Sequence, residues 1–302
     1  MRLEIGREKD GKTVLEILKK EMRLSSKMIT MLKGREDGIT VDGTHVTVRR
    51  ILREGEVLAL ATEDRDENEN LVPTEMSLDI VYEDDDIILI NKPPMMPTHP
   101  SHGHFDDTLA NGVCFHIQKN SKDPFVFRSV NRLDRNTSGL VLVAKNRISA
   151  SLLYGAMQKG QIKKKYIALL SGKIPERGTI DTYIRRKEAS IITRQVCGAL
   201  PDAARAVTEY EVIDSSNNIT AVKASPITGR THQLRLHFAH IGAPIIGDDL
   251  YGKPSTLIKR QALHAYYLAF PHPRSGEIMN FCANVPDDME AIILKHDLKI
   301  EV

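Results

Sequence analysis

A carboxylate in a polar loop between two apolar segments is the feature of this sequence best suited to chemistry. Asp134 follows Arg132 closely, and Thr137, Ser138 and Gly139 come before the apolar run LVLVA. Strands on both sides can hold such a carboxylate exposed at the tip of the loop, and the glycine permits a turn or the close approach of a ligand. From this segment alone, an ordinary ion-paired loop is an equally good interpretation.

Two groups of histidines raise a second possibility, metal-dependent hydrolysis. The groups are His99, His102 and His104, and His232, His237 and His240. His237 and His240 share a helical face, and metal sites often use such spacing. However, the sequence has no HExxH motif, and Asp248 and Asp249 could add carboxylates only in an assumed fold. A metal-dependent nuclease or phosphatase is therefore a minor alternative, and we expect no metal.

The charge distribution points to a polyanionic partner. The net charge is only +2, but residues 62–90 contain eleven acidic side chains against one arginine, whereas residues 128–240 contain nineteen Lys and Arg against eight acidic residues. A basic region of this size attracts polyanions such as RNA and accelerates their encounter. A solvated surface with clustering by chance is the alternative reading of the charges.

Several classes of protein are excluded by what the sequence lacks. The 302 residues contain no apolar run near 18 residues, which predicts no membrane span, and the charged N-terminus is unlike a secretory signal. Three scattered cysteines without a CxxC motif predict neither a disulfide framework nor a zinc finger, so we expect a reducing, cytoplasmic setting. No coiled-coil heptads appear, and we expect a monomer.

The first 62 residues predict a small α/β module. Apolar positions in residues 14–22 fall on one helical face, and Ser25 or Ser26 can cap a second helix that Gly34 ends. The dipeptide at 42–43, Asp-Gly between β-branched runs, predicts a hairpin before a last strand, VLALA.

This order of helix, helix, hairpin and strand resembles the S4 RNA-binding module over residues 12–62. The resemblance implies that basic side chains of the two helices contact RNA phosphates. These side chains are Arg23, Lys27, Lys33 and Arg35. A small helical cap that packs on the main domain is the alternative.

The remaining chain is expected to form an acidic linker, residues 63–77, and a second domain, residues 78–302. Apolar, often alternating segments predict strands, and three segments have helical spacing, without a βαβ rhythm. Strands are expected within 79–94, 125–134, 139–146, 163–172, 206–214, 218–226, 266–270 and 279–285, and helices within 108–118, 148–160 and 230–242. The fold class is therefore α+β, with a mixed, largely antiparallel sheet flanked by helices and loops.

The segment VNRLDRNTSGLVLVAKN, residues 130–146, resembles the signature of RluA-type RNA pseudouridine synthases. That signature reads His-Arg-Leu-Asp, two variable residues, Thr-Ser-Gly and an apolar strand ending in Ala-Lys. Asn131 stands where the family usually has histidine. Asparagine can replace histidine as a hydrogen-bond donor but cannot carry its charge. The substitution leaves the role of the aspartate intact and argues against a proton role at position 131.

Three further segments resemble the family in the same order along the chain. They are NKPPMMPTHPS at 91–101, KKKYIALLSG at 163–172 and TGRTHQLRLHFAHIGAPIIGDDLYG at 228–252. Pro94 stands at or near a position where the family often has glycine. The resemblance spans roughly residues 80–285, nearly the whole second domain.

The resemblance implies that the enzyme isomerises uridine to pseudouridine in RNA without a cofactor. The target base must leave its stack and enter a pocket. Asp134 would start the reaction, by attacking the sugar or the base or by removing a ribose proton. Arg235 would pair with Asp134 and keep it ionised and aimed. Tyr166 would lie against the flipped base and could help to remove the C5 proton, either directly or as a stacking wall with another group as the base.

Other residues of the same motifs are expected to contact the base or the RNA. They are Asn131, Arg132, Thr137, Ser138, Gly139, Lys165, Arg230, His232, Gln233 and Leu234. Large-subunit ribosomal RNA is the expected substrate, with transfer RNA as the alternative. A non-catalytic RNA-binding or ribosome-assembly factor is the third possibility.

Overall fold

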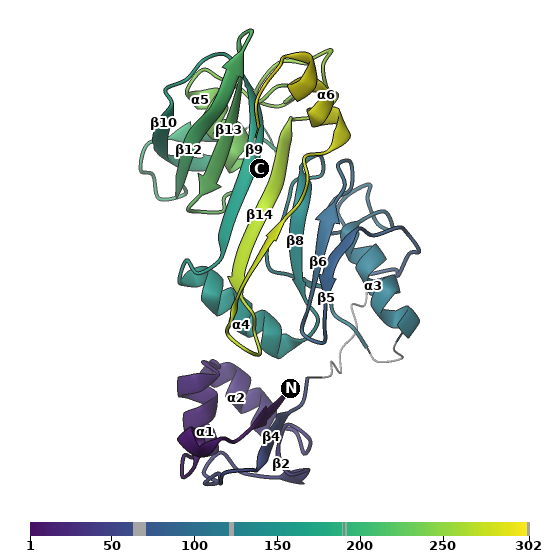
Figure 1. Cartoon of the computed structure of the whole chain (residues 1–302), viewed down its shortest axis with the longest axis vertical. Helices are drawn as coiled ribbons and strands as arrows, with labels where there is room; N and C mark the ends of the chain where they lie inside the picture. Colours follow the sequence, from purple (N-terminus) through teal and green to yellow (C-terminus); the bar gives the residue numbers. More distant parts are fainter. Residues whose placement is uncertain (63–70, 121–123, 189, 191, 301–302) are drawn as a thin grey trace.

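The computed structural model describes residues 1–62, 71–120, 124–188, 190 and 192–300. An N-terminal module lies at one end of the long axis, and a larger body built around one extended sheet forms the rest (Figure 1). Two sheets organise these parts, one of four strands and one of eleven.

The N-terminal module combines a small sheet with short helical segments. Its elements are β1 Arg2–Glu4, a 3₁₀ turn Arg7–Lys9, α1 Val14–Glu16, a π-helical segment Ile17–Glu21, α2 Ser26–Lys33, β2 Ile39–Val41, β3 Thr44–His45 and β4 Val57–Leu60. The strand order is β1-β4-β2-β3. The predicted helices, hairpin and last strand are present. The strand β1 was not predicted, because three residues are too few to show a period in the sequence.

Local hydrogen bonds explain why these helices begin and end where they do. Thr13 and Glu16 form a reciprocal capping box at the start of α1. The Ser25 hydroxyl accepts a hydrogen bond from the Met28 amide and caps α2, as predicted. Asp42 and Gly43 both have positive φ, the conformation that a two-residue hairpin turn requires.

The module packs on the larger body through α4 (Arg147–Gln158). Its apolar core includes Val14, Leu18, Leu32, Ile39 and Leu58, and Ile148 of α4 is buried in the same cluster. Leu152, one turn further along α4, packs against this cluster. The apolar contact fixes where the module attaches.

The larger body is an α+β fold with a mixed, largely antiparallel sheet, as predicted. Its elements are β5 Ile80–Glu83, β6 Ile87–Lys92, α3 Leu109–Asn120, β7 Arg128–Ser129, β8 Ser138–Ala144, α4, β9 Lys163–Ser171, β10 Arg177–Arg186, β11 Arg194–Cys197, β12 Ala204–Ser216, β13 Ile219–Pro226, α5 Gln233–His240, β14 Leu263–Pro271, β15 Ile278–Cys282 and α6 Asp287–Lys295. The order is β11-β10-β12-β13-β9-β14-β8-β6-β5, with β15 beside β14 and β7 beside β8. Among the pairs of described strands, β14 with β8 is parallel and the others are antiparallel. No helix within the described ranges has the length and apolar character needed to cross a membrane.

Several elements differ from the sequence-based expectation. The strand expected over 125–134 is a pair of residues, β7, followed by a loop. The helix expected from residue 230 begins at Gln233, because the backbone of His232 is left-handed, with φ of 56°. The strands β10 and β11 and the helix α6 were not predicted. Within the expected linker, residues 63–70 lie outside the described ranges, and residues 71–77 contain no helix or strand.

The middle of the large sheet is a rigid, doubly covered frame. All seven residues of β8 are buried. Val141 and Val143 belong to one apolar cluster, whereas Leu140 and Leu142 belong to another, as expected for side chains that alternate between two faces. This buried strand begins at Ser138, directly after the loop that contains Asp134.

Gly139 marks the closest approach of two strands beside that loop. Its φ is 117°, and a Cβ at this position would lie 2.3 Å from the carbonyl oxygen of Ala265, its partner in β14. We predict that Gly139→Ala destabilises the protein by at least about 2 kcal/mol, because strained backbone and overpacking add. Urea denaturation of the full chain measures the loss.

Gly155→Ala provides the matched control for this prediction. Gly155 lies in α4, and a Cβ there would meet nothing within 4 Å. Alanine is favoured over glycine in helices, so this variant should be neutral or slightly more stable, by up to about 1 kcal/mol. Equal stability of the two variants would refute the close approach at Gly139.

Candidate active site

Asp134 lies in a loop between β7 and β8 that hydrogen bonds hold from several directions. The Leu133 amide donates a hydrogen bond to the Thr98 hydroxyl, and this hydroxyl donates one to the Leu133 carbonyl. The Gln261 side chain donates to the Thr137 hydroxyl, and the Thr137 amide donates to the Asp134 carbonyl. The Asp134 side chain is 28% exposed. The structure therefore presents one partly exposed carboxylate on a fixed loop.

Lys92, at the end of β6, is a fully buried lysine beneath this loop. Its ammonium group donates to the carbonyls of Pro93, Met96 and Arg135, at 2.8, 2.8 and 3.1 Å. Burial and the charge of Arg260 lower the pKa of Lys92 to about 7, and the negative charge of Asp134 opposes that shift. Lys92 thus connects the turn after β6 to the residue that follows Asp134.

Arg235, on α5, faces Asp134 but is held mainly by a different carboxylate. Its Nη1 lies 3.5 Å from Asp134 Oδ2. Its Nε and Nη2 each donate to Asp248 at 2.7 Å, and Nη2 also lies 3.2 Å from Asp249. Burial opposes the charge, but the bond to Asp248 prevails and raises the pKa of Arg235. The expected pairing of Arg235 with Asp134 is therefore a longer, secondary contact.

His232 is the second side chain that faces Asp134. Its Nε2 lies 3.9 Å from Asp134 Oδ2, and its Nδ1 lies 2.9 Å from the hydroxyl of Tyr251. Burial lowers the pKa of His232, with a smaller opposing effect from Asp134. The imidazole is therefore neutral near pH 7, and its contact with Asp134 is not an ion pair.

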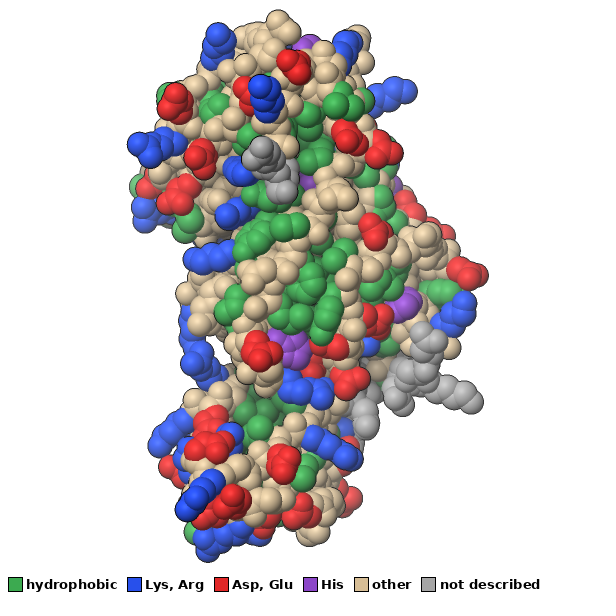
Figure 2. Space-filling model, in the orientation of Figure 1, with side chains coloured by type: hydrophobic (Ala, Val, Ile, Leu, Met, Phe, Trp, Pro, Cys, Tyr) green, Lys and Arg blue, Asp and Glu red, His purple; other side chains and the backbone are tan. Residues whose placement is uncertain are grey.

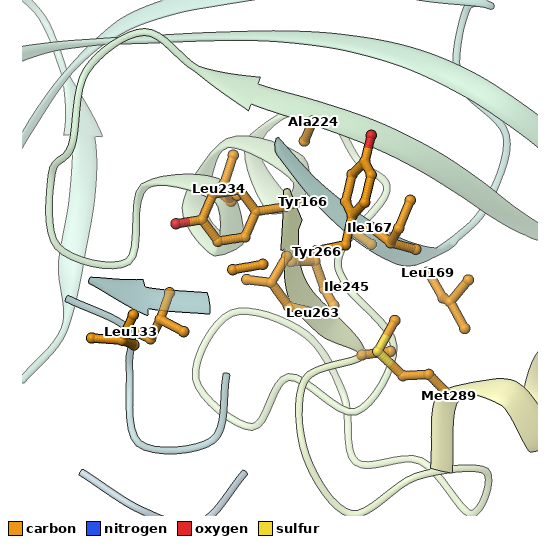
Figure 3. Close-up of a cluster of buried hydrophobic side chains, with 14 of the residues drawn as sticks. Leu133, Tyr166, Ile167, Leu169, Ala224, Leu234, Ile245, Leu263, Tyr266 and Met289 are labelled. Carbon is orange, nitrogen blue, oxygen red and sulfur yellow. The ribbon is translucent and has the colours of Figure 1, made fainter. Parts of the chain in front are cut away.

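Tyr166, on β9, is buried in the same apolar cluster as Leu133 and Leu234. Figure 3 shows its ring close to Leu234, with its hydroxyl pointing outward from the cluster. Burial and the negative charge of Asp134 raise the pKa of Tyr166 well above its ordinary range. The phenol is thus protonated at neutral pH and forms an apolar wall with Leu234 on the Asp134 side.

Several predicted substrate contacts are instead buried within the protein. Asn131 donates to the Leu140 carbonyl and accepts from the Leu142 amide, which explains why strand pairing is interrupted there. Gln233 donates to the Val207 carbonyl, and the Ser138 hydroxyl bonds to His264. Asn131, Thr137, Ser138, Gly139 and Gln233 are all buried. These five residues lie beneath the surface of the site, where they hold its backbone in place.

The predicted basic contacts are mostly exposed. Arg132, Lys165 and Arg230 are open to solvent on the larger body, and Arg23, Lys27 and Lys33 are open on the N-terminal module. Arg35 differs, because its guanidinium donates to both oxygens of Asp37, at 2.9 and 2.6 Å.

Four of the six histidines considered for metal binding, His99, His104, His232 and His237, are engaged in other hydrogen bonds. Both ring nitrogens of His237 bond threonine hydroxyls, and His99 bonds Ser129. Within the described ranges, one set of side chains has metal-ligand spacing, namely Asp84, Asp86 and His272. Arg274 pairs with Asp86 at 2.6 Å, and His272 bonds Asp84 at 2.8 Å. These contacts make the set a hydrogen-bonded ion-pair cluster, and we assign no metal to it.

Sequence reasoning missed three residues around Asp134, although signals for them were present. Lys92 belongs to the Lys-Pro pair of the segment at 91–101. Asp248 and Tyr251 belong to the Gly-Asp-x-x-Tyr-Gly end of the segment at 228–252. Their motifs were identified, but only the folded structure shows that these side chains meet Asp134, Arg235 and His232.

Comparisons with known proteins show the family of this chain. The family model described as RNA pseudouridylate synthase matches residues 86–240. A Bacillus subtilis protein named uncharacterized RNA pseudouridine synthase YjbO is 39% identical over 274 residues, which cover 90% of this chain and 95% of that protein. Ribosomal large subunit pseudouridine synthase D of Vibrio cholerae is 36% identical over 287 residues, covering 89% and 86% of the two chains.

A solved structure shows the same relationship in three dimensions. Human RNA pseudouridylate synthase domain containing 1 superposes with a TM-score of 0.58 at 30% identity, over 69% of this chain and 83% of that one. The residues matched by the family model include the loop of Asp134. The chain therefore belongs to the RNA pseudouridine synthases, isomerases that act on RNA, as its RluA-type motifs predicted.

Proposed function

We propose that this enzyme converts specific uridines of large-subunit ribosomal RNA into pseudouridine, and that Asp134 is its reacting residue. The observation that carries the proposal is a partly exposed carboxylate on a fixed loop, faced by Arg235 at 3.5 Å and by His232 at 3.9 Å. The ribosomal substrate is supported by the name of the Vibrio cholerae relative, which resembles this chain over most of its length.

The proposed reaction is an isomerisation in which atoms and electrons balance within the substrate. The bond between C1′ and N1 of uracil breaks, the bond between C1′ and C5 forms, and the proton on C5 is replaced by one on N1. The uridine must be extruded from its helix to reach Asp134, at the cost of unstacking. Asp134 reacts first with the extruded nucleotide and is restored at the end of each turnover.

Tyr166 serves this reaction as a wall for the uracil ring. Its pKa is raised by burial and by Asp134, so a phenolate is not available as a base near neutral pH. Its ring and Leu234 lie on the same apolar surface, which favours a flat, apolar base over water. Removal of the C5 proton therefore falls to a different group, and Asp134, whose charge acts on Tyr166, is our candidate.

Arg235 places a positive charge beside Asp134. Its Nη1 lies 3.5 Å from Asp134 Oδ2, a distance at which a cation attracts a carboxylate. Because Asp248 holds two guanidinium nitrogens at 2.7 Å, Arg235 cannot swing fully onto Asp134 as a tight pair. The carboxylate thus stays free to react.

We further propose that residues 1–62 form an S4-like RNA-binding module ahead of a catalytic domain at 78–302. Its exposed cations Arg23, Lys27 and Lys33 support this role, whereas Arg35 is already paired with Asp37. Figure 2 shows basic side chains interspersed with acidic ones over the module. Binding would therefore depend on individual phosphate contacts rather than on a uniformly basic face.

We also propose a cytoplasmic location. The three cysteines, Cys114, Cys197 and Cys282, are free thiols, which fits a reducing compartment. Ribosomal RNA as substrate fits the same compartment.

The first test is pseudouridine formation on unmodified ribosomal RNA fragments with no metal or cofactor added. The wild type should form pseudouridine at defined sites, and Asp134→Asn should form none while binding the RNA with similar affinity. Asp297→Asn is the control, because Asp297 is exposed and has a left-handed φ of 51° that asparagine tolerates. Product on transfer RNA alone would correct the substrate, and tight binding without product from any RNA would favour a binding factor.

The second test concerns the buried carboxylate behind Arg235. Asp248→Asn should lower the free energy of unfolding by about 3 kcal/mol or more, because it removes the buried, doubly bonded charge partner of a buried guanidinium and leaves only the longer contacts with Asp249 and Asp134. Asp288→Asn is the matched control: Asp288 holds Arg260 through two 2.7 Å bonds, but its side chain is 39% exposed. Chemical denaturation of both variants measures the difference, and equal losses would contradict a special role for the buried pair.

The third test concerns the module. Replacing both Lys27 and Lys33 by alanine should weaken RNA binding and flatten the dependence of log affinity on log salt by about 2, roughly one for each phosphate contact. Replacing the exposed Lys295 and Lys299 near the C-terminus by alanine should leave the slope unchanged. An unchanged slope in the first variant would remove these lysines from the RNA interface.

A further inference from the structure

The hydroxyl of Tyr251 stands behind the two side chains that face Asp134. It accepts a hydrogen bond from the Arg194 amide at 2.8 Å and lies 2.9 Å from His232 Nδ1. The Arg235 guanidinium also lies over the Tyr251 ring in a cation–π contact, with Cζ 5.5 Å from the ring centroid. One tyrosine thus contacts both neighbours of the reacting carboxylate.

The direction of these hydrogen bonds decides where the imidazole proton lies. A backbone amide can only donate, so the Tyr251 oxygen accepts from Arg194 and keeps its own hydrogen for another partner. Burial raises the pKa of Tyr251, which keeps that hydrogen in place at neutral pH. His232 is neutral there and has one nitrogen that accepts and one that donates.

Only one of the two imidazole tautomers satisfies both neighbours of His232. If Nδ1 accepts from Tyr251, the proton sits on Nε2, 3.9 Å from Asp134 Oδ2. The opposite tautomer would direct the lone pair of Nε2 at the carboxylate, which is repulsive. The 3.9 Å separation is an electrostatic contact, longer than a direct hydrogen bond.

We propose that Tyr251 is a positioning residue that holds His232 with its proton on Nε2, so that Asp134 faces two donors, Arg235 and His232. The inference rests on the proposed function, because it assigns a role in the reaction of Asp134. The backbone supports it independently: His232 has a left-handed φ of 56°, a conformation that non-glycine residues keep only where surrounding contacts enforce it.

The arrangement affects chemistry more than RNA binding. Tyr251 acts on Asp134 through His232 and through the face of its ring against Arg235. Loss of the hydroxyl alone leaves the ring and its contact with Arg235, but it lets the His232 proton occupy either nitrogen. The carboxylate then loses a defined donor, and turnover falls while contacts to RNA phosphates remain.

The test variant is Tyr251→Phe, assayed as the full chain on the RNA that the wild type modifies. We expect kcat to fall about tenfold, the effect of one well-placed hydrogen bond, with KM and RNA affinity nearly unchanged. Tyr82→Phe is the matched control. Tyr82 lies on β5, and its hydroxyl donates a hydrogen bond to Asp84 at 2.9 Å, so the variant also removes one bonded tyrosine hydroxyl. An unchanged kcat in Tyr251→Phe would overturn the proposal.

A second readout separates positioning from a merely structural role. With ¹⁵N-labelled histidine, the wild type should show His232 with a protonated Nε2 and an unprotonated Nδ1, and Tyr251→Phe should show a mixture. In a His232→Ala background, Tyr251→Phe should cause no further loss of kcat, because both changes remove one interaction. If the losses of kcat in the two single variants multiply in the double variant, the inference is refuted. A wild-type His232 protonated on Nδ1 would refute it as well. The nitrogen spectra need no substrate, so an inactive wild type would refute the proposed function and leave the proton assignment measurable.

Discussion

The buried ion pair between Arg235 and Asp248 is the constraint on which the site depends. A guanidinium that is almost fully buried persists only with a carboxylate partner and satisfied donors. Asp248, itself fully buried, supplies two 2.7 Å bonds, and its Oδ1 also accepts from the amides of Leu250 and Tyr251. The pair therefore fixes α5 and the turn that follows Asp248 at once, which brings Tyr251 into contact with both Arg235 and His232.

The large sheet brings this ion pair to the Asp134 carboxylate. Lys92, Asp134 and Tyr166 come from β6, from the loop before β8 and from β9, which lie near one another in the strand order β9-β14-β8-β6. Because β8 is buried along its whole length, the loop before it starts from an immobile base. Lys92 and Gln261 then tie the loop from two sides. Rigidity matters here because a small displacement of a reacting group is costly to catalysis.

Sequence motifs predicted which residues gather, but not how they bond. Asp134 was recognisable from the pattern of residues around it. Its contact with Arg235 was anticipated as a primary pair, yet the buried Asp248, thirteen residues after Arg235, holds the arginine more tightly, at 2.7 Å against 3.5 Å. The spacing of residues in the sequence does not indicate which of two carboxylates, Asp134 or Asp248, the long side chain of Arg235 reaches. In the same way, the start of α5 at Gln233 depends on the left-handed His232, whose conformation is enforced by contacts distant in sequence.

The position of the N-terminal module limits what it contributes. It packs on α4, which follows the end of β8, whereas the loop of Asp134 precedes the start of that strand. The seven residues of β8 span about 20 Å at roughly 3.3 Å each. In the RNA binding that we propose, a cation on the module would meet phosphates distant from the extruded uridine and would not touch the base. Its proposed effect is on the local concentration and register of the RNA, while the chemistry is assigned to Asp134 and its neighbours.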